Sequence, residues 1–191
     1  MYDITIRKET PADVPAIFEL NLRAFGQPAE AMLVDTLRQD GDFIPALSLV
    51  AVDEGRIVGH ILFPPVTIES KTGSVPALAL GPMAVLPELR RRGIGSLLVQ
   101  KGLAACRRLG HRIVVVVGHP VYYPKFGFFP ALEWGIELPF PVPDEAFMVT
   151  ALVEGALEGV HGTVRYPHAF GVTVEREVVS ERIYDLHTNT F

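Results

Sequence analysis

The sequence predicts an α/β (α+β) fold in which strands and helices are interspersed along the chain. Two observations indicate this class. An apolar run over residues 75–86 leads through a Gly-x-Gly loop into a segment with helical periodicity, residues 94–109. The run Ile113–Val117 follows, and its uninterrupted apolar, β-branched composition is typical of a strand buried on both faces.

The N-terminal part predicts one strand and two helices. Residues 4–7 alternate as a short strand does. Thr10 is a candidate N-cap and Pro11 suits the first helical position, so a helix is expected to run to about Ala24. Residues 25–28 break it, and a second helix is expected over residues 29–39.

The middle of the chain predicts strands over residues 47–52 and 56–63, joined at an Asp-Glu-Gly hairpin turn. Two prolines interrupt the pattern, and residues 66–69 resume it before a Lys-Thr-Gly-Ser turn. Residues 75–86 are expected to form a single strand that leads to the arginine-rich loop. Beyond residues 132–138 and a proline-rich link, the last expected strand covers residues 146–153.

The loop after residue 86 has the composition of an anion site. Three consecutive arginines, Arg90, Arg91 and Arg92, precede Gly93 and Gly95, and a helix starts there. Glycines let backbone N–H groups approach an anion closely, and a helix N-terminus offers unpaired N–H groups and the positive end of its dipole. Guanidinium groups add donors suited to phosphate. The sequence therefore predicts a ligand that carries more than one phosphate.

Two common phosphate-binding motifs do not match. A Walker A loop requires a Gly-Lys pair, and the chain contains none. The dinucleotide fingerprint requires a third glycine, but Leu98 stands in its place. The remaining pattern, Arg90-x-x-Gly93-x-Gly95, resembles the pyrophosphate loop of the GCN5-related N-acetyltransferases (GNAT superfamily).

A second segment resembles the same family. The stretch that follows the strand at residues 113–117 is similar to the family pattern F-Y-x-x-x-G-F, with Tyr122, Tyr123, Gly127 and Phe128 in the corresponding places. The two motifs occur in the expected order and are separated by one helix. The resemblance covers residues 4 to about 170 and points to the YhbS-like predicted acetyltransferases.

This resemblance implies the acyl-CoA N-acyltransferase fold. Its central sheet is mixed and mostly antiparallel, has helices on both faces, and contains a V-shaped splay between two parallel strands that admits the pantetheine arm. The expected domain is residues 1–171, with residues 172–191 as an extension that is a strand, an interface segment or a frayed tail. The implied co-substrate is acetyl-CoA, with no metal. Its expected contacts are main-chain atoms on the strand before the loop and the loop with the helix start, namely Met83, Ala84, Val85, Arg90, Arg91, Arg92, Gly93, Ile94, Gly95 and Ser96.

The resemblance also implies how the chemistry runs. An amine attacks the thioester directly, in a ternary complex, and a backbone N–H near Val85 stabilises the oxyanion. Tyr123 matches the family position whose phenol faces the sulfur and is the expected general acid, whereas Tyr122 is expected to pack. The general base stays open between a water chain, His119 and Glu30. For Glu30 itself, a solvated position at a helix start is the simpler expectation.

Charge and composition indicate what kind of ligand the protein binds and in which compartment it is found. Residues 86–112 carry a net charge of +6 on a chain of net charge −5, a local patch that suits a compact polyanion better than a nucleic acid. Arg107 and Arg108 also suit the negative end of a helix dipole. The expectations are no membrane segment, a cytoplasmic protein, a packed Cys106, and no metal-ligand spacing among the histidines.

The acceptor is left open between a small-molecule amine and a peptide or protein amine. Two other functions remain at this stage. One is an acyl-CoA-binding regulatory or sensor module without turnover. The other is a scaffold, with a possible homodimer formed through the segment after residue 171.

Overall fold

The computed structural model describes residues 4–171. The predicted C-terminal extension, residues 172–191, lies outside the described residues. In chain order the helices are α1 (Val14–Phe25), α2 (Ala29–Gln39) and α3 (Ile94–Arg108). The strands are β1 (Thr5–Lys8), β2 (Ser48–Asp53), β3 (Arg56–Leu62), β4 (Pro65–Ser70), β5 (Gly73–Ala79), β6 (Met83–Val85), β7 (Ile113–Val117), β8 (Phe129–Pro130), β9 (Ile136–Glu137), β10 (Phe147–Ala151) and β11 (Gly162–Arg165).

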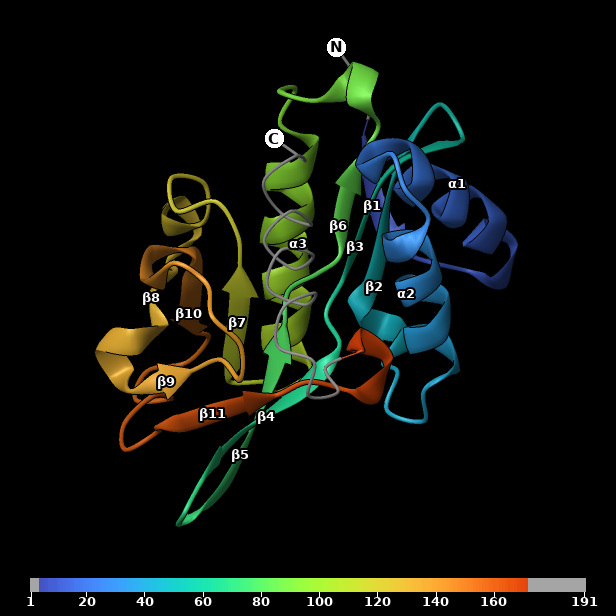
Figure 1. The fold of residues 1–191 in the computed structure, drawn as a ribbon. Coiled ribbons are helices and arrows are strands. Elements are labelled where there is room, and N and C mark those ends of the chain that lie inside the picture. The colour runs from blue at the N-terminus through green and yellow to red at the C-terminus, as the bar shows by residue number, and fades with distance from the viewer. Residues whose placement is uncertain (1–3, 172–191) are drawn as a thin grey trace.

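The strands pair in two groups that together form a curled, mixed sheet (Figure 1). A four-stranded part has the order β1-β2-β3-β6, and a seven-stranded part has the order β8-β10-β7-β5-β4-β11-β9. Pairing is antiparallel except between β5 and β7 and between β11 and β9. The mixed, mostly antiparallel fold with a splayed parallel pair is therefore confirmed.

Helices cover both faces of the four-stranded part. A Cβ atom built on Gly59 of β3 would contact Leu98 and Ile94, so this side of β3 faces α3. His60, the next residue, must then face the opposite layer, where α1 and α2 pack. This alternation separates the large core beneath α3 from the smaller cluster of Ile17, Val34 and Val50.

The prediction of a single strand over residues 75–86 is wrong, because this segment forms two strands. The chain forms β5, leaves the sheet at Gly81–Pro82, and re-enters it as β6 beside a different partner. Proline has no N–H to donate, and the Gly81 N–H instead donates to the Leu62 carbonyl at 2.9 Å. As a result, the residues before the interruption pair with β7 and those after it pair with β3.

Two other boundaries differ from the sequence prediction. The expected strand at residues 146–153 is shortened to β10 (Phe147–Ala151), and it is not the last. The strand β11 follows at Gly162–Arg165 and pairs with β4. At Gly162, φ is +133° and an added Cβ would lie 2.1 Å from the Glu69 carbonyl oxygen, so the close approach of these strands requires glycine.

A buried polar network ties β1, α2, β2 and β3 together. The Glu9 carboxylate accepts hydrogen bonds from Arg38 Nε at 2.7 Å and from Ser48 Oγ at 2.5 Å. Ser48 Oγ also lies 2.9 Å from His60 Nε2. Because the serine proton is donated to Glu9, the serine oxygen accepts the Nε2–H of a neutral His60. This assignment leaves His60 Nδ1 as a buried acceptor without a protein partner among the described residues.

The network fixes the direction of two pKa shifts. Burial alone raises the pKa of Glu9, but its interactions with His60, Arg38 and Ser48 outweigh burial and lower it to about 2. Burial lowers the pKa of His60, and the neighbouring Glu9 only partly offsets this. At neutral pH the folded state therefore contains Glu9 as the anion and His60 as the neutral base, and protonation of either group in acid opposes folding.

The network predicts a loss of stability in acid. Since the pKa of Glu9 is depressed in the folded state, its contribution is complete above 4.5, its ordinary value, and is lost as the pH falls toward about 2. Glu9→Gln should lower the free energy of unfolding at pH 7 by about 3 kcal/mol, because it leaves Arg38 and His60 without the buried anion. It should also flatten the acid limb of a plot of stability against pH, measured by urea denaturation. The matched control is Glu69→Gln, which removes an exposed pair with Arg165 and should change stability much less. Equal losses in the two variants would contradict this account.

Candidate functional site

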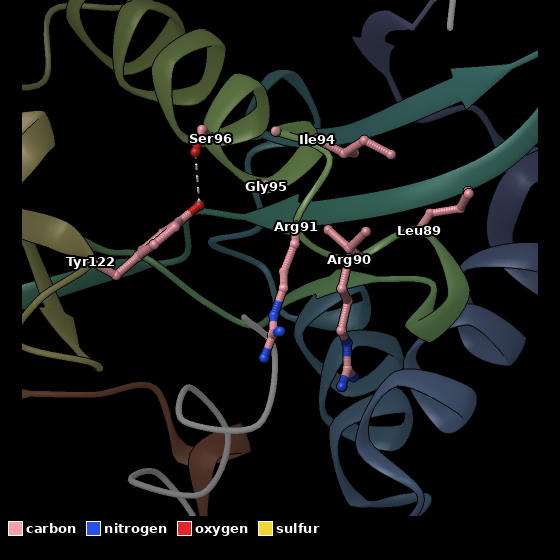
Figure 2. Close-up of a pocket in the computed structure, with 9 residues that line it drawn as sticks. Leu89, Arg90, Arg91, Ile94, Gly95, Ser96 and Tyr122 are labelled. Atoms are coloured by element: carbon pink, nitrogen blue, oxygen red, sulfur yellow. Dashed lines mark hydrogen bonds between the residues drawn. The ribbon is translucent and has the colours of Figure 1, made fainter.

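A pocket of about 140 Å³ opens at the N-terminus of α3 (Figure 2). Its walls come from the end of β6, the loop that follows, the first turn of α3 and one tyrosine from the segment after β7. The lining residues are Val85, Leu89, Arg90, Arg91, Gly93, Ile94, Gly95, Ser96 and Tyr122.

The helix start provides free donors at this pocket. Gly93 is the N-cap, with a left-handed φ of +82°, and no side chain caps the helix. The first intrahelical bond runs from the Leu97 N–H to the Gly93 carbonyl at 3.0 Å. The N–H groups of Ile94, Gly95 and Ser96 therefore have no helical acceptor, and all three residues line the pocket. This geometry is typical of an anion site.

Tyr122 closes one side of the pocket. Its hydroxyl lies 3.4 Å from Ser96 Oγ, and a Cβ added to Gly95 would come within 3.0 Å of it. Lys125 Nζ sits 3.8 Å from the centre of the Tyr122 ring. The sequence analysis expected Tyr122 to pack, and its ring does pack against the core beside Tyr123 and Phe126, but its phenol also forms part of the pocket wall. The position of the Tyr122 hydroxyl relative to α3 is not encoded in local sequence, because β7 lies between them along the chain.

The three arginines are not equivalent. Arg90 donates from Nη2 to the Ala24 carbonyl at 2.6 Å, at the end of α1, and burial lowers the pKa of this guanidinium. A cation there complements the helix dipole of α1. Arg91 lines the pocket and adopts a left-handed φ of +61°. Figure 2 shows both guanidinium groups directed away from Ser96. Arg92 is exposed and lies outside the pocket lining.

The strand β6 presents two of its three residues to the gap beside β7. Leu86 donates to the Val58 carbonyl and Leu62 donates to the Pro82 carbonyl, and the register places Ala84 opposite His60. In an antiparallel ladder, alternate residues direct their N–H and C=O groups to opposite edges. Ala84 therefore bonds to β3, and the main-chain groups of Met83 and Val85 point away from β3.

The other side of the gap is the end of β7. The Val115 carbonyl accepts the Leu80 N–H at 2.8 Å, one residue beyond the pairing of Ala79 with Val115. Val117 has the same parity as Val115, so its main-chain groups face the same edge beyond the point where pairing stops. Sequence analysis did not select Val117; the alternation of the run Ile113–Val117 would have indicated it only once the register was known.

Tyr123 does not line the pocket. Its ring is fully buried and contacts those of Tyr122 and Phe128 at centroid distances of 5.1 and 5.6 Å. Burial raises the pKa of its phenol well above the ordinary value of 10, and the nearby Tyr122 adds to this. The hydroxyl therefore keeps its proton at neutral pH, as a proton donor must.

The two candidate bases lie in different environments. His119 is exposed, and its Nδ1 accepts the Val121 N–H at 3.3 Å. Glu30 is only 1% exposed, so the expectation of a solvated carboxylate is wrong. Its Oε1 accepts a hydrogen bond from Gln27 Nε2 at 2.8 Å, and no protein group among residues 4–171 bonds to Oε2. Tertiary packing of α2 buries this helix-start carboxylate.

The part of the chain that the structure describes contains no candidate metal cluster and no exposed thiol. Within residues 4–171, no group of three histidine, cysteine, aspartate or glutamate side chains could hold a metal ion. Cys106 is buried as expected, and burial raises the pKa of its thiol to about 12. No helix among the described residues is long and apolar enough to cross a membrane.

Comparisons with known proteins agree with this geometry. The family model described as an acetyltransferase (GNAT) domain matches residues 5–131. The chain is 40% identical over 146 residues to the uncharacterized N-acetyltransferase YjhQ of Escherichia coli K12, covering 76% of this chain and 81% of that protein. It is 38% identical over 166 residues to the uncharacterized N-acetyltransferase YhbS of the same strain, covering 86% and 97%.

Two solved structures resemble this one and contain the coenzyme. YhbS from E. coli in complex with CoA gives a TM-score of 0.83 at 35% identity and covers 91% of this chain and 95% of that one. A GNAT acetyltransferase from Brucella melitensis in complex with acetyl-CoA gives 0.72 at 32% identity, covering 89% and 99%. The family match and these relatives identify the chain as an N-acetyltransferase. The chain belongs to the GNAT family of N-acetyltransferases.

Proposed function

We propose that this protein transfers the acetyl group of acetyl-CoA to an amine by direct attack within a ternary complex. The observation that carries the proposal is the gap between β6 and β7, which ends beside the uncapped N-terminus of α3. We assign this activity to residues 1–171. The CoA and acetyl-CoA complexes of the two relatives support the choice of co-substrate.

In this proposal the pyrophosphate binds the N–H groups of Ile94, Gly95 and Ser96. Gly93 allows the left-handed turn that directs them, and the absence of a Cβ on Gly95 keeps the pocket open below Tyr122. Arg91 and Arg92 supply positive charge from the exposed side. Arg90 holds the loop against α1 through its bond to Ala24 and acts as a positioning residue.

The pantetheine arm would lie in the gap. Its amides would pair with main-chain groups of Met83 and Val85 on one strand and of Val117 on the other, since these are directed into the gap. Ala84 would support the arm only through packing. The N–H of Val85 is the donor best placed to stabilise the oxyanion that forms when the amine attacks the thioester.

Tyr123 is the proposed general acid for the departing thiolate. Its buried phenol retains its proton, and Tyr122 and Phe128 hold its ring in place. For the base, we favour a water chain to solvent. The strand path from residue 75 to residue 86 contains no acid or histidine, and the Nδ1 lone pair of His119 is engaged by the Val121 N–H.

The acceptor is a small-molecule amine or a peptide or protein amine. A screen of both classes with CoA release as the readout distinguishes them. Acetyl-CoA binding without turnover of any amine would favour the sensor module.

The helix start predicts where binding can be removed. Gly93→Glu places a carboxylate against three unpaired N–H groups and should abolish the 1:1 binding of acetyl-CoA measured by calorimetry. The control is Gly159→Glu, because Gly159 also has a left-handed φ, of +70°, and open space where a Cβ would be, but is not part of the pocket lining. Unchanged affinity in a folded Gly93→Glu variant would refute the site.

The role of Tyr123 predicts a selective kinetic defect. Tyr123→Phe should lower kcat by about 10²- to 10⁴-fold, the usual cost of losing a general acid, and should leave acetyl-CoA affinity nearly unchanged. Tyr122→Phe is the matched control and should affect acetyl-CoA affinity more than kcat, because its hydroxyl lies in the pocket wall. Steady-state kinetics with an accepted amine and calorimetry separate the two effects. If Tyr123→Phe had the wild-type kcat across the pH range, Tyr123 would not be the general acid and would only pack.

A further inference from the structure

A second pocket, of about 360 Å³, lies between strand β1 and the C-terminal half of α3. This volume is in the range of small-molecule sites. β1 is an edge strand of the four-stranded part of the sheet. Ser96, at the first pocket, precedes Arg108 by twelve residues of the same helix, or about 18 Å at 1.5 Å per residue. The two pockets are therefore separate sites.

The floor of this pocket is apolar. Leu49 and Ala105 are each 5% exposed and form part of the lining, and Leu109 contributes a side chain that is half exposed. Lys101, Ala105, Arg108 and Leu109 follow the spacing of one helix face, so α3 presents a continuous surface here.

The rim is cationic and largely uncompensated. Arg7 is neutralised by a two-pronged ion pair with Asp13 at 2.6 and 2.9 Å. Lys8, Lys101 and Arg108 also line the pocket, and no carboxylate of residues 4–171 lies within ion-pair distance of them. On a chain with a net charge of −5, three such cations around one apolar hollow indicate an anionic ligand.

A helix-dipole role does not account for this arrangement. Of the two arginines at the end of α3, Arg107 donates from Nε to the Leu152 carbonyl at 2.6 Å and does not line this pocket. Arg108 lines the pocket. Lys101 lies two turns before the helix end, beyond the range over which the dipole acts.

The position also discriminates between anions. The C-terminal half of α3 carries the negative end of the helix dipole and offers no free N–H groups, unlike the first pocket. A phosphate dianion is therefore less suited than a carboxylate monoanion, because the negative end of the dipole repels two negative charges more strongly than one. The apolar floor suits an aliphatic body attached to that head group.

We propose that the pocket between β1 and α3 binds a small aliphatic carboxylate, with the head group at Lys8, Lys101 and Arg108 and the chain on Leu49, Ala105 and Leu109. This ligand is distinct from the coenzyme and from the acetyl acceptor. The proposal is independent of the transferase chemistry, since it concerns a different end of α3.

The test is calorimetric titration of the whole protein with octanoate, below its micelle concentration. Octanoate should bind 1:1, and octyl phosphate and 1-octanol should each bind more weakly. The double variant Lys101→Gln/Arg108→Gln should weaken octanoate binding about tenfold, because two exposed charge contacts are removed. Lys71→Gln, which changes an exposed lysine in the turn between β4 and β5, is the control and should have no effect. Acetyl-CoA affinity should be the same in all three proteins.

Three results would overturn the proposal. The first is an absence of octanoate binding, including the case in which the protein binds anionic lipid vesicles instead. The second is equal binding to the wild-type protein and the folded double variant. The third is competition between octanoate and acetyl-CoA, which would place the carboxylate in the first pocket.

Discussion

The change of pairing partner between β5 and β6 is the feature on which the rest of this structure depends. Ala79 is paired with β7, and Met83, four residues later, is paired with β3. This separation opens the gap and fixes which main-chain groups face it. It also places the end of β6 beside the start of α3, where Val85 and the first turn of the helix line the same pocket.

Helix α3 then organises the charge of the protein. The sequence shows a single basic patch over residues 86–112, but the structure divides it. The arginine loop lies at the positive end of the helix, where Arg90 binds α1 and Arg91 lines the first pocket. Lys101 and Arg108 lie on the distal half beside β1. Arg107 is directed toward the carbonyl of Leu152. The basic side chains of this one segment therefore make contacts in different parts of the fold.

Much of this arrangement could be predicted from the sequence. The helix from Ile94 to Arg108 and the strand Ile113–Val117 follow from periodicity and β-branched composition, and the motifs identified the family. The strand break at Gly81–Pro82 was missed because it lies within an apolar run whose composition hides the change of partner. Burial of Glu30 and the placement of Tyr122 in the pocket wall depend on contacts between distant elements, which local patterns do not contain. The roles of the individual site residues stay predictions.

The central claim is that the gap between β6 and β7 holds the pantetheine arm through main-chain groups of alternating residues. Amide resonances of ¹⁵N-labelled protein titrated with acetyl-CoA test it residue by residue. The account predicts that the amides of Met83, Val85 and Val117 shift and become protected from hydrogen exchange, whereas those of Ala84 and Val116, already bonded to neighbouring strands, change little. Perturbation confined to the loop at Gly93–Ser96, with Val85 and Val117 unchanged, would contradict it, because the coenzyme would then lie outside the gap.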